Sequence, residues 1–501
     1  MANPAFDDHV GAHEAKLYKE AAGEVVVAHL LWGDGVHFVG ESRDGRREVR
    51  ARHRTRTGWI DEADPGGQSL LEIYFIDVGQ GDGVLVKTPD FRHVVIDGGH
   101  PRRSQNAGKS AADFIDWKFF HDYRMDRIEL DAMIASHNDY DHYGGLDDLL
   151  DVAQTDELDT RGISVEAFYH AGVSWWVGDD GKRTLGRNHS VGDRRWLVEL
   201  LNDRASAEAG TDSAAGARQL QGAWGEFIGK VVGATTRSGA ATPISRLSWR
   251  SGDLPGFGGD GAPRIRILGP IDEDLGEAGT GVPDLRSASQ STNGNSVLLR
   301  LDHGRTRVLL TGDLNKSSQK LLLGAYGERR SEFECDVAKA CHHGSADVSM
   351  TFLQAMRPAA TIMSSGDGEG HDHPRPAIVA ASGATGHLTI ENDEIVTPLV
   401  YSTEIARSCL LGRPYELALS DQAGGAVVAG AALGTSDIRF RVTEPGALRD
   451  RKGVRKVGRS RVVAKFVYGL VNMRTDGETI LLATLNEGDG TWATRSFKSR
   501  F

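Results

Sequence analysis

The sequence contains very little cysteine and no long apolar run. Only three of its 501 residues are cysteines, Cys335, Cys341 and Cys409, and these cannot build a disulfide framework, which favours a reducing compartment. The longest apolar runs, VVVAHLLW at 25–32 and AGGAVVAGAALG at 423–434, fall short of the roughly 20 residues that a transmembrane helix needs. The N-terminal segment also lacks the basic and apolar regions of a signal peptide. We therefore expect a cytoplasmic protein without a membrane partner.

Proline is scarce, with 15 residues, whereas glycine is abundant, with 62, which favours strands and turns over long helices.

The net charge of −12 excludes a uniformly basic surface, but the charge is uneven along the chain. Residues 41–56 hold seven arginines against three acids, and residues 448–465 hold eight basic residues against one aspartate. The simpler interpretation is a solvated basic surface, and the alternative is a tether for a polyanion such as nucleic acid.

The length predicts two or three domains. Residues 1–66 predict a small β module, and its RTRTGWID end resembles the close of an SH3-like barrel. Residues 395–501 predict a C-terminal β-rich domain, with a hairpin cue at Thr475-Asp476-Gly477. Between them, residues 69–392 alternate short apolar strands with helices. Within this region, residues 151–265 are rich in tryptophan and irregular, so we interpret them as an insertion that caps the site.

The segment SHNDYDH, residues 136–142, places two histidines and two aspartates directly after an apolar strand. The four are His137, Asp139, Asp141 and His142. His and carboxylate side chains are ligands for Zn²⁺, Mn²⁺ or Fe. We expect the first pair to face one metal and the second pair, at the start of the next helix, to face another. That helix is predicted from GGLDDLLDVAQ, and the paired glycines would let the loop pack closely.

Three further clusters follow the same pattern of a strand and then a polar loop. TGD ends one strand with Asp313, CHHGS supplies His342 and His343, and GHDHP supplies His371, Asp372 and His373. Each cluster alone could be an ordinary turn or a set of core histidines. Together they predict ligands that converge at one edge of a β-sheet structure.

The ordered set IDVGQGDGVLV, VVIDGG, SHNDYDHYGGL, NGNSVLLRL, LLTGDL, CHHGS and GHDHP resembles the metallo-β-lactamase superfamily, in particular the catalytic domain of ComEC-type competence proteins. The resemblance runs over about residues 70–390. It implies an α+β fold, a four-layer αββα sandwich with small flanking all-β domains, and two divalent metal ions, Zn or Mn. ComEC-type proteins carry a membrane channel, so the resemblance supports the chemistry and not the transport role.

The resemblance also assigns roles to individual residues. It implies that the metals are held by six side chains, which are His137, Asp139, Asp141, His142, Asp313 and either His343 or His342, of which we favour His343. It gives catalytic roles to Asp141, His342 and His373. It makes Asn295, Asp82 and Ser345 candidates for substrate contacts. Where many superfamily members have a further histidine, this sequence has STNGNSV, so Asn293 or Asn295 takes that place. His170 could instead complete the site, although a core histidine is the simpler interpretation.

These features predict a metal-dependent hydrolase that uses a metal-bound hydroxide, either a phosphodiesterase or a nuclease. The prediction that the substrate is nucleic acid depends on the two basic segments, 41–56 and 448–465. One alternative is hydrolysis of a small-molecule ester, lactone or cyclic nucleotide in a pocket formed by the insertion. Another is a non-catalytic metal-binding scaffold whose β domains contact partners. The oligomeric state is not predicted.

Overall fold

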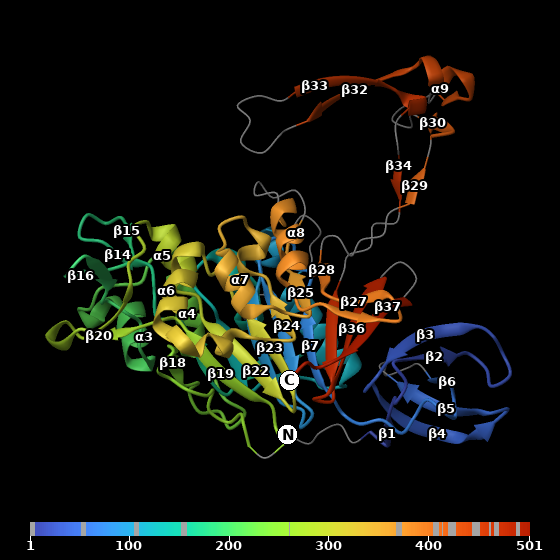
Figure 1. The fold of residues 1–501 in the computed structure, drawn as a ribbon, viewed down its shortest axis with the longest axis horizontal. Helices are drawn as coiled ribbons and strands as arrows, with labels where there is room; N and C mark the ends of the chain where they lie inside the picture. The colour runs from blue at the N-terminus through green and yellow to red at the C-terminus, as the bar shows by residue number, and fades with distance from the viewer. Residues whose placement is uncertain are drawn as a thin grey trace.

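A computed structural model describes residues 6–51, 57–104, 110–151, 158–259, 261–366, 373–403, 410–412, 414–418, 427–442, 451–459, 462–464, 470–486 and 491–501. Its centre consists of two β-sheets with helices packed against each of them (Figure 1). The sheets are buried on both faces, and their strands are accordingly near-continuous apolar runs.

The first sheet has nine strands in the order β18-β13-β11-β9-β8-β7-β35-β36-β37. The strands are β7 (Leu71–Phe75), β8 (Gly83–Lys87), β9 (His93–Gly98), β11 (Ala132–Ala135), β13 (Phe168–His170), β18 (Ile244–Arg246), β35 (Val471–Thr475), β36 (Thr479–Asn486) and β37 (Thr491–Lys498). Strands β9, β11, β13 and β18 are parallel to one another. Their carboxyl ends therefore meet at one edge of the sheet.

The second sheet has six strands in the order β19-β22-β23-β24-β25-β28. The strands are β19 (Arg264–Gly269), β22 (Leu298–His303), β23 (Thr306–Leu310), β24 (Val337–Lys339), β25 (Ala360–Met363) and β28 (Leu399–Ser402). Strands β23, β24, β25 and β28 are parallel.

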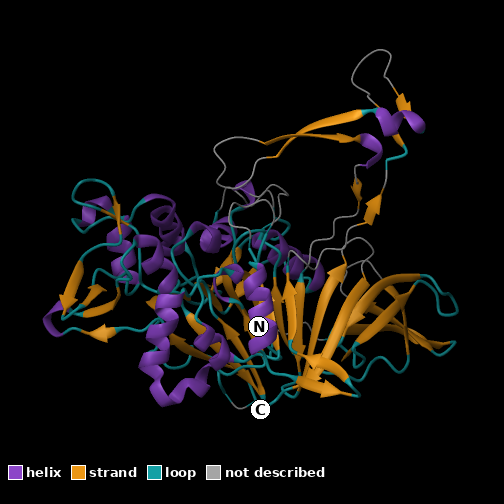
Figure 2. Cartoon of the chain, turned by 45° about the horizontal axis from the view of Figure 1, so that its top comes forward, coloured by secondary structure: helices purple, strands orange, loops and turns teal. Residues whose placement is uncertain are grey.

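One apolar core lies between the two sheets, and alternate residues of both point into it, such as Phe75 and Ile134 from the first and Val308 and Ile362 from the second. A separate cluster packs helices against the first sheet, namely α1 (Ala111–Trp117), α2 (Tyr140–Leu150) and α4 (Gly222–Gly233). Another packs helices against the second sheet, namely α6 (Lys316–Tyr326), α7 (Met350–Met356) and α8 (Pro376–Thr385). Figure 2 shows these helices flanking the strands.

Helix α1 ends at Trp117, and the chain continues as one π-helical turn, η2 (Lys118–Asp122). Ser110 caps α1 in a capping box with Asp113. The helix predicted from Gly144 begins earlier, at Tyr140, because the polar residues of the ligand segment form its first turn.

The predicted N-terminal β module forms a six-stranded sheet in the order β1-β4-β5-β6-β2-β3, with a small core of its own. Its strands are β1 (Asp8–His9), β2 (Glu14–Tyr18), β3 (Val26–Leu31), β4 (Gly35–Arg43), β5 (Arg46–Ala51) and β6 (Thr57–Asp61). The resemblance of its end to an SH3-like barrel stays a prediction.

The segment predicted as an insertion, 151–265, contributes to the first sheet, because β13 and β18 pair parallel with their neighbours there. The rest forms small elements, which are β12 (Ile163–Val165) beside β10 (Ile128–Leu130), β14 (Trp176–Val177), β15 (Arg183–Thr184), β16 (Asn188–Val191), β17 (Arg194–Leu197) and α3 (Arg204–Thr211). Strands β16 and β17 join β20 (Glu273–Asp274) and β21 (Thr280–Pro283) in a four-stranded sheet. Helix α5 (Ala288–Gly294) then leads into β22.

The C-terminal segment also joins the central sheets and is not a separate unit in the described residues. Strand β28 belongs to the second sheet, and β35–β37 extend the first, with the predicted hairpin turn at 476–478. The hairpin of β26 (Thr389–Glu391) and β27 (Glu394–Thr397) precedes β28. The elements between β28 and β35 stand away from the sheets in Figure 1. They are β29 (Leu410–Gly412), β30 (Glu416–Ala418), β31 (Val427–Ala429), α9 (Ala431–Thr435), β32 (Asp437–Val442), β33 (Arg451–Lys456) and β34 (Val462–Ala464).

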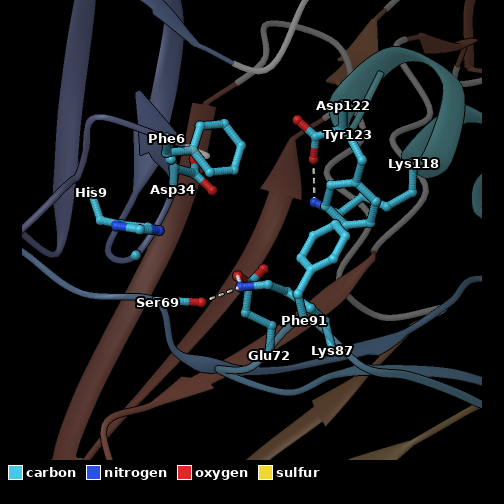
Figure 3. Close-up of a pocket in the computed structure, with 12 residues that line it drawn as sticks. Phe6, His9, Asp34, Ser69, Glu72, Lys87, Phe91, Lys118, Asp122 and Tyr123 are labelled. Carbon is cyan, nitrogen blue, oxygen red and sulfur yellow. Dashed lines mark hydrogen bonds and ion pairs between the residues drawn. The ribbon is translucent and has the colours of Figure 1, made fainter. Parts of the chain in front are cut away.

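A buried ionic network joins the N-terminal module to the first sheet. Arg474 of β35 is 1% exposed and donates to Asp34 Oδ1 at 2.8 Å and to the Trp32 carbonyl at 2.6 Å. Its other terminal nitrogen lies 3.4 Å from Glu72 Oε2. Burial opposes ionisation of Glu72, but Arg474 and Lys87 outweigh it and hold the pKa of this carboxyl well below its usual range. Figure 3 shows Asp34 and Glu72 at this junction.

Substitution of Arg474 by methionine should destabilise the protein by about 3–5 kcal/mol, because it removes the charged partner of buried Asp34 and one of the two cations beside buried Glu72. Chemical denaturation monitored by circular dichroism measures the change. The matched control is R495M, since Arg495 is an exposed arginine of β37 and should cost less than about 0.5 kcal/mol. Equal effects of the two substitutions would contradict the structural role of the network.

Candidate metal centre

The predicted ligand segments all follow the carboxyl ends of parallel strands. The segment from Ser136 follows β11 of the first sheet, whereas Asp313 follows β23 and His343 follows β24 of the second sheet. His343 lies in a short 3-10 turn, η7 (Cys341–Gly344). Two sheets that share one core therefore bring their polar loops to a common edge.

His142 is fixed from both sides of its ring. Its Nδ1 lies 2.8 Å from Asp97 Oδ2, and its Nε2 lies 3.3 Å from Asp313 Oδ2. Asp97 also accepts hydrogen bonds from the Ser136 backbone nitrogen at 2.7 Å and from its hydroxyl at 2.6 Å. A carboxylate on Nδ1 orients the imidazole so that Nε2 faces the centre.

Asp313 is the meeting point of the two sheets' ligands. His343 Nε2 lies 3.0 Å from Asp313 Oδ2 and 3.8 Å from Asp141 Oδ2. His343 Nδ1 faces Asp82 Oδ1 at 3.2 Å. Lys339 forms an ion pair with Asp82 and lies 3.5 Å from Asp313 Oδ1. Its ammonium thus balances part of the buried negative charge.

Among the residues that the structure describes, four groups of three side chains bring ligand atoms within 4.8 Å of one another. They are His137, His142 and Asp313; Asp141, His142 and His343; Asp82, Asp313 and His343; and Asp82, Asp97 and His142. Asp313 and His142 recur among them, so the groups form one continuous centre and not separate sites.

The donor atoms fit a divalent cation. The Nε2 atoms of His137, His142 and His343 and Oδ1 of Asp313 are buried and lack a well-aligned hydrogen-bond partner among the described residues. Two ligands about 2.1 Å from a tetrahedral ion lie about 3.4 Å apart, close to the separations of both imidazoles from Asp313. A mixed imidazole and carboxylate set suits Zn²⁺, Mn²⁺ or Fe. Buried His/Asp clusters of this kind are consistent with a metal site.

Neighbouring carboxylates raise the pKa values of two imidazoles at the centre. Burial opposes protonation of His142, but Asp313 and Asp97 outweigh it and hold its pKa well above the usual value. Burial likewise opposes protonation of His343, but Asp313 and Asp82 raise its pKa to about 9. A bound cation would take the place of these protons, because a ligand imidazole must be neutral.

The segment that carries His342 and His343 has a strained backbone. Both residues have positive φ angles, 47° and 55°, and Gly344 follows at 83°. Such angles are unfavourable for non-glycine residues and persist where the surrounding structure enforces them. They turn the two successive histidines in different directions, so that His343 is fully buried and His342 is partly exposed.

Asp139 and Asn293 form the more open side of the centre. Asp139 Oδ2 lies 3.8 Å from His137 Nε2, and burial together with Asp141 raises the pKa of Asp139 to about 7. In the amide orientation that satisfies its neighbours, the Asn293 nitrogen lies 2.8 Å from Asp139 Oδ2. Of the two asparagines considered from the sequence, Asn293 is therefore the one at the centre.

Asn295 and Ser345, predicted to contact substrate, make local bonds to the backbone. Asn295 Nδ2 donates to the carbonyls of Pro283 and Ser291, and Ser345 Oγ accepts from the backbone nitrogen of Asp347. Asp82 is 3% exposed and lies behind His343. The substrate-binding roles of the three residues stay predictions.

The predicted catalytic residues His342 and His373 lie together beside the centre. His342 Nε2 is 3.7 Å from Asp313 Oδ2, and the rings of His342 and His373 are 5.7 Å apart. His371 and Asp372 lie outside the described residues. His170 is a core residue, because its ring stacks on Phe168 and it belongs to none of the four ligand groups.

The sequence interpretation did not assign roles to Asp97, Lys339, Ser136 or Ser296. A sequence feature could have identified Asp97, because VVIDGG ends a strand with an aspartate. In the structure its φ of 57° lies in the left-handed region, which is unusual for a residue other than glycine. Ser296 donates to the Asn293 carbonyl at 2.7 Å and accepts from the backbone nitrogen of Asp313 at 3.0 Å. Serines and a lysine near a strand end carry no distinctive pattern, so only the folded structure identifies them.

Close packing at two glycines positions α2. A Cβ atom at Gly145 would lie 2.1 Å from the Gly98 carbonyl oxygen, and one at Gly144 would lie 2.3 Å from Pro101 Cδ. The absence of side chains lets α2 approach the end of β9, which brings His142 to Asp97. The predicted role of the two glycines in close packing is confirmed.

The insertion contacts the ligand segment from the other side. Trp175 Nε1 donates to the Asn138 carbonyl at 3.0 Å. Tyr143 of α2 stacks on Phe227 of α4 with ring centroids 5.1 Å apart. These contacts hold the first turn of α2, which carries Asp141 and His142.

A profile of the metallo-beta-lactamase superfamily matches residues 76–366, more than half of the chain. The chain belongs to this superfamily. The matched range contains every described residue of the four ligand groups. Within the described part of the chain, no helix combines the length and hydropathy needed to cross a bilayer.

Two curated relatives are similar to short parts of this metallo-beta-lactamase chain. Competence protein ComA of Neisseria gonorrhoeae is 33% identical over 102 residues, which are 20% of this chain and 14% of ComA. ComE operon protein 3 of Bacillus subtilis (strain 168) is 29% identical over 90 residues, 18% of this chain and 11% of that protein. The chain therefore matches only a small part of either relative. A solved structure of a CmlA beta-hydroxylase mutant aligns at 11% identity with a TM-score of 0.27, covering 59% of this chain and 46% of that one, and carries no argument.

The purified protein should bind divalent metal, and D313N should lose at least about tenfold in metal affinity, because Asp313 lies between His142 and His343. Metal titration of chelator-treated protein, followed by elemental analysis, measures this. The matched control is H170Q, a change of a buried core histidine outside the ligand groups, which should retain metal. Metal loss in H170Q with retention in D313N would contradict the assignment.

Proposed function

We propose that this chain is a metal-dependent hydrolase of phosphoesters, either a phosphodiesterase or a nuclease, built on a four-layer αββα sandwich. The observation that carries the proposal is the position of Asp313, whose Oδ2 faces His142 at 3.3 Å and His343 at 3.0 Å in a buried centre. A desolvated set of imidazoles and carboxylates is costly to fold unless a cation offsets it.

Two divalent cations would be held at this centre. His137 and Asp139 would hold one, and Asp141, His142 and His343, which form one of the ligand groups, would hold the other, with Asp313 beside them. Bound divalent cations acidify water and polarise phosphoryl oxygens. The carboxylate-rich first position, with Asp139 and Asn293 in place of further histidines, favours hard metals such as Mn²⁺ beside Zn²⁺.

The chain's own residues would support the reaction around these ions. Asp97 and Asp82 orient the imidazoles of His142 and His343 through their Nδ1 atoms. The side chain of His342 is partly exposed beside Asp313. Its imidazole can therefore donate a hydrogen bond to a substrate oxygen on which negative charge develops, and the neighbouring His373 can do the same.

A basic cleft supports an anionic substrate. A cleft of about 670 Å³ lies between β17, β21 and α6, and its lining includes Arg194, Arg286 and Lys320. These three cations form no ion pair with the described residues, whereas the neighbouring Arg195 pairs with Asp284 at 3.1 Å. Gln290 of α5 also lines the cleft, and Asn293 is one helical turn further, about 4.5 Å along the axis. Phosphates bound in the cleft would thus extend from the metal centre.

The two basic segments remain a weaker argument for nucleic acid. In the first, Arg46 is already engaged, since it pairs with Asp61 at 3.0 Å and covers the ring of Tyr18. Much of the second segment lies outside the residues whose side chains are described. The cleft therefore offers the better candidate for contacts with a polyanion.

The alternatives are a hydrolase of a small ester, lactone or cyclic nucleotide, and a scaffold without catalysis. The contacts of Trp175 and Phe227 with the ligand segment allow the insertion to limit the size of the substrate, which favours a small molecule. The scaffold alternative has no comparable observation, because a structural role does not require three imidazole nitrogens without well-aligned partners.

The metal-loaded protein should hydrolyse bis-p-nitrophenyl phosphate, and D313N should reduce kcat by at least about a hundredfold through loss of the metals. Single-stranded and double-stranded DNA, a lactone and a phosphocholine ester are tested beside it, with Mn²⁺ or Zn²⁺ restored to stripped protein.

Arg194→Gln and Arg286→Gln should raise KM for DNA and weaken the dependence of DNA binding on salt, while leaving hydrolysis of the small diester unchanged. Metal-loaded protein that is inert to all of these substrates would contradict the proposal.

A further inference from the structure

A second pocket lies on the outer face of the first sheet, away from the metal centre. It has a volume of about 320 Å³, within the range of small-molecule sites. Its apolar lining is provided by Tyr74, Phe114, Trp117, Leu470, Leu485 and Trp492. Four of these six side chains are aromatic, so the walls offer flat surfaces for stacking.

The pocket lies between two parts of the chain that cover the same face of the first sheet. On one side, α1 and η2 pack over Tyr74 of β7. On the other, Leu31 and Trp32 of the N-terminal module pack over Leu481 and Ala483 of β36. The strands between these two coverings are β7, β35 and the start of the β36–β37 hairpin.

Asn472 forms the polar floor of this gap. It lies on β35 between Tyr74 of β7 and Ala483 of β36. Its chain neighbours Val471 and Met473 point into the core between the sheets, so strand alternation turns Asn472 to the pocket side. The side chain is 0% exposed, and neither its oxygen nor its nitrogen has a partner among the described residues.

A buried primary amide without partners is costly and rare. A ligand that supplies one donor and one acceptor would satisfy both of its atoms. A charged ligand is not needed to neutralise the charged side chains that line the pocket, because each of them forms an ion pair within the protein. Lys118 pairs with Asp122, as Figure 3 shows, and Arg474 pairs with Asp34 and Glu72.

We propose that this pocket binds a nucleobase. The primary amide of asparagine offers one donor and one acceptor, which pair with a donor and an acceptor on the edge of a base. Aromatic walls stack on the faces of a base. A purely aliphatic ligand would leave the Asn472 amide unpaired, and an anionic ring would meet no free cation among the described lining residues. The sugar and any phosphates would extend toward the open side, where Trp117 is 36% exposed.

Isothermal titration of the full-length, metal-loaded protein with adenosine tests the proposal, with ribose, which lacks the base, as the comparison. We expect saturable binding of adenosine and at least about tenfold weaker binding of ribose. Asn472→Leu should retain or raise Tm, because it replaces an unpaired buried amide with an apolar group of similar shape, and should lose adenosine binding by at least about tenfold.

Trp117→Ala provides a second variant at the rim, and stacking on a base predicts a loss of about tenfold or more. Its matched control is Tyr415→Ala, an aromatic side chain that is 83% exposed and does not line the pocket, which should bind like the wild type. No saturable binding of adenosine, or binding that both N472L and W117A leave unchanged, would overturn the proposal. Binding that is lost in D313N would assign adenosine to the metal centre and would overturn it too, whatever the hydrolase assay shows.

Discussion

The carboxylate of Asp313 lies between His142 from the first sheet and His343 from the second, and the arrangement of the rest of the molecule follows from this contact. His142 and His343 reach Asp313 from different sheets, so this part of the centre forms only where the two sheets meet. Because β11, β23 and β24 all present their carboxyl ends to one edge, three loops far apart in the chain meet at a single carboxylate. The shared core between the sheets fixes the distance across which they meet.

The second requirement is compensation of buried charge. Asp82, Asp97 and Asp313 are all at most 3% exposed, and their negative charges are offset by Lys339 and by the imidazoles of His142 and His343. This balance allows the centre to fold, while the imidazole Nε2 atoms, which lack well-aligned hydrogen-bond partners among the described residues, stay available to a cation. The strained backbone at His342 and His343 further lowers the stability of the folded state at this position.

The sequence was sufficient to predict the ligand segments, because SHNDYDH, TGD and CHHGS each follow an apolar strand and such strands end at one edge. It could not separate Asn293 from Asn295, since the turn of α5 that brings only the first to Asp139 depends on tertiary packing. It also missed that β13, β18 and β35–β37 extend the first sheet. Pairing between strands that lie tens to hundreds of residues apart leaves no local pattern, so these strands were predicted as parts of an insertion and of a separate domain.

The most direct test of the central claim is anomalous X-ray diffraction from crystals soaked with Mn²⁺ or Zn²⁺. The account predicts a strong anomalous peak within about 2.0–2.3 Å of Asp313 Oδ2, His142 Nε2 and His343 Nε2, and a second peak beside His137 and Asp139. An absence of anomalous signal at Asp313, with metal found only on surface carboxylates, would contradict it.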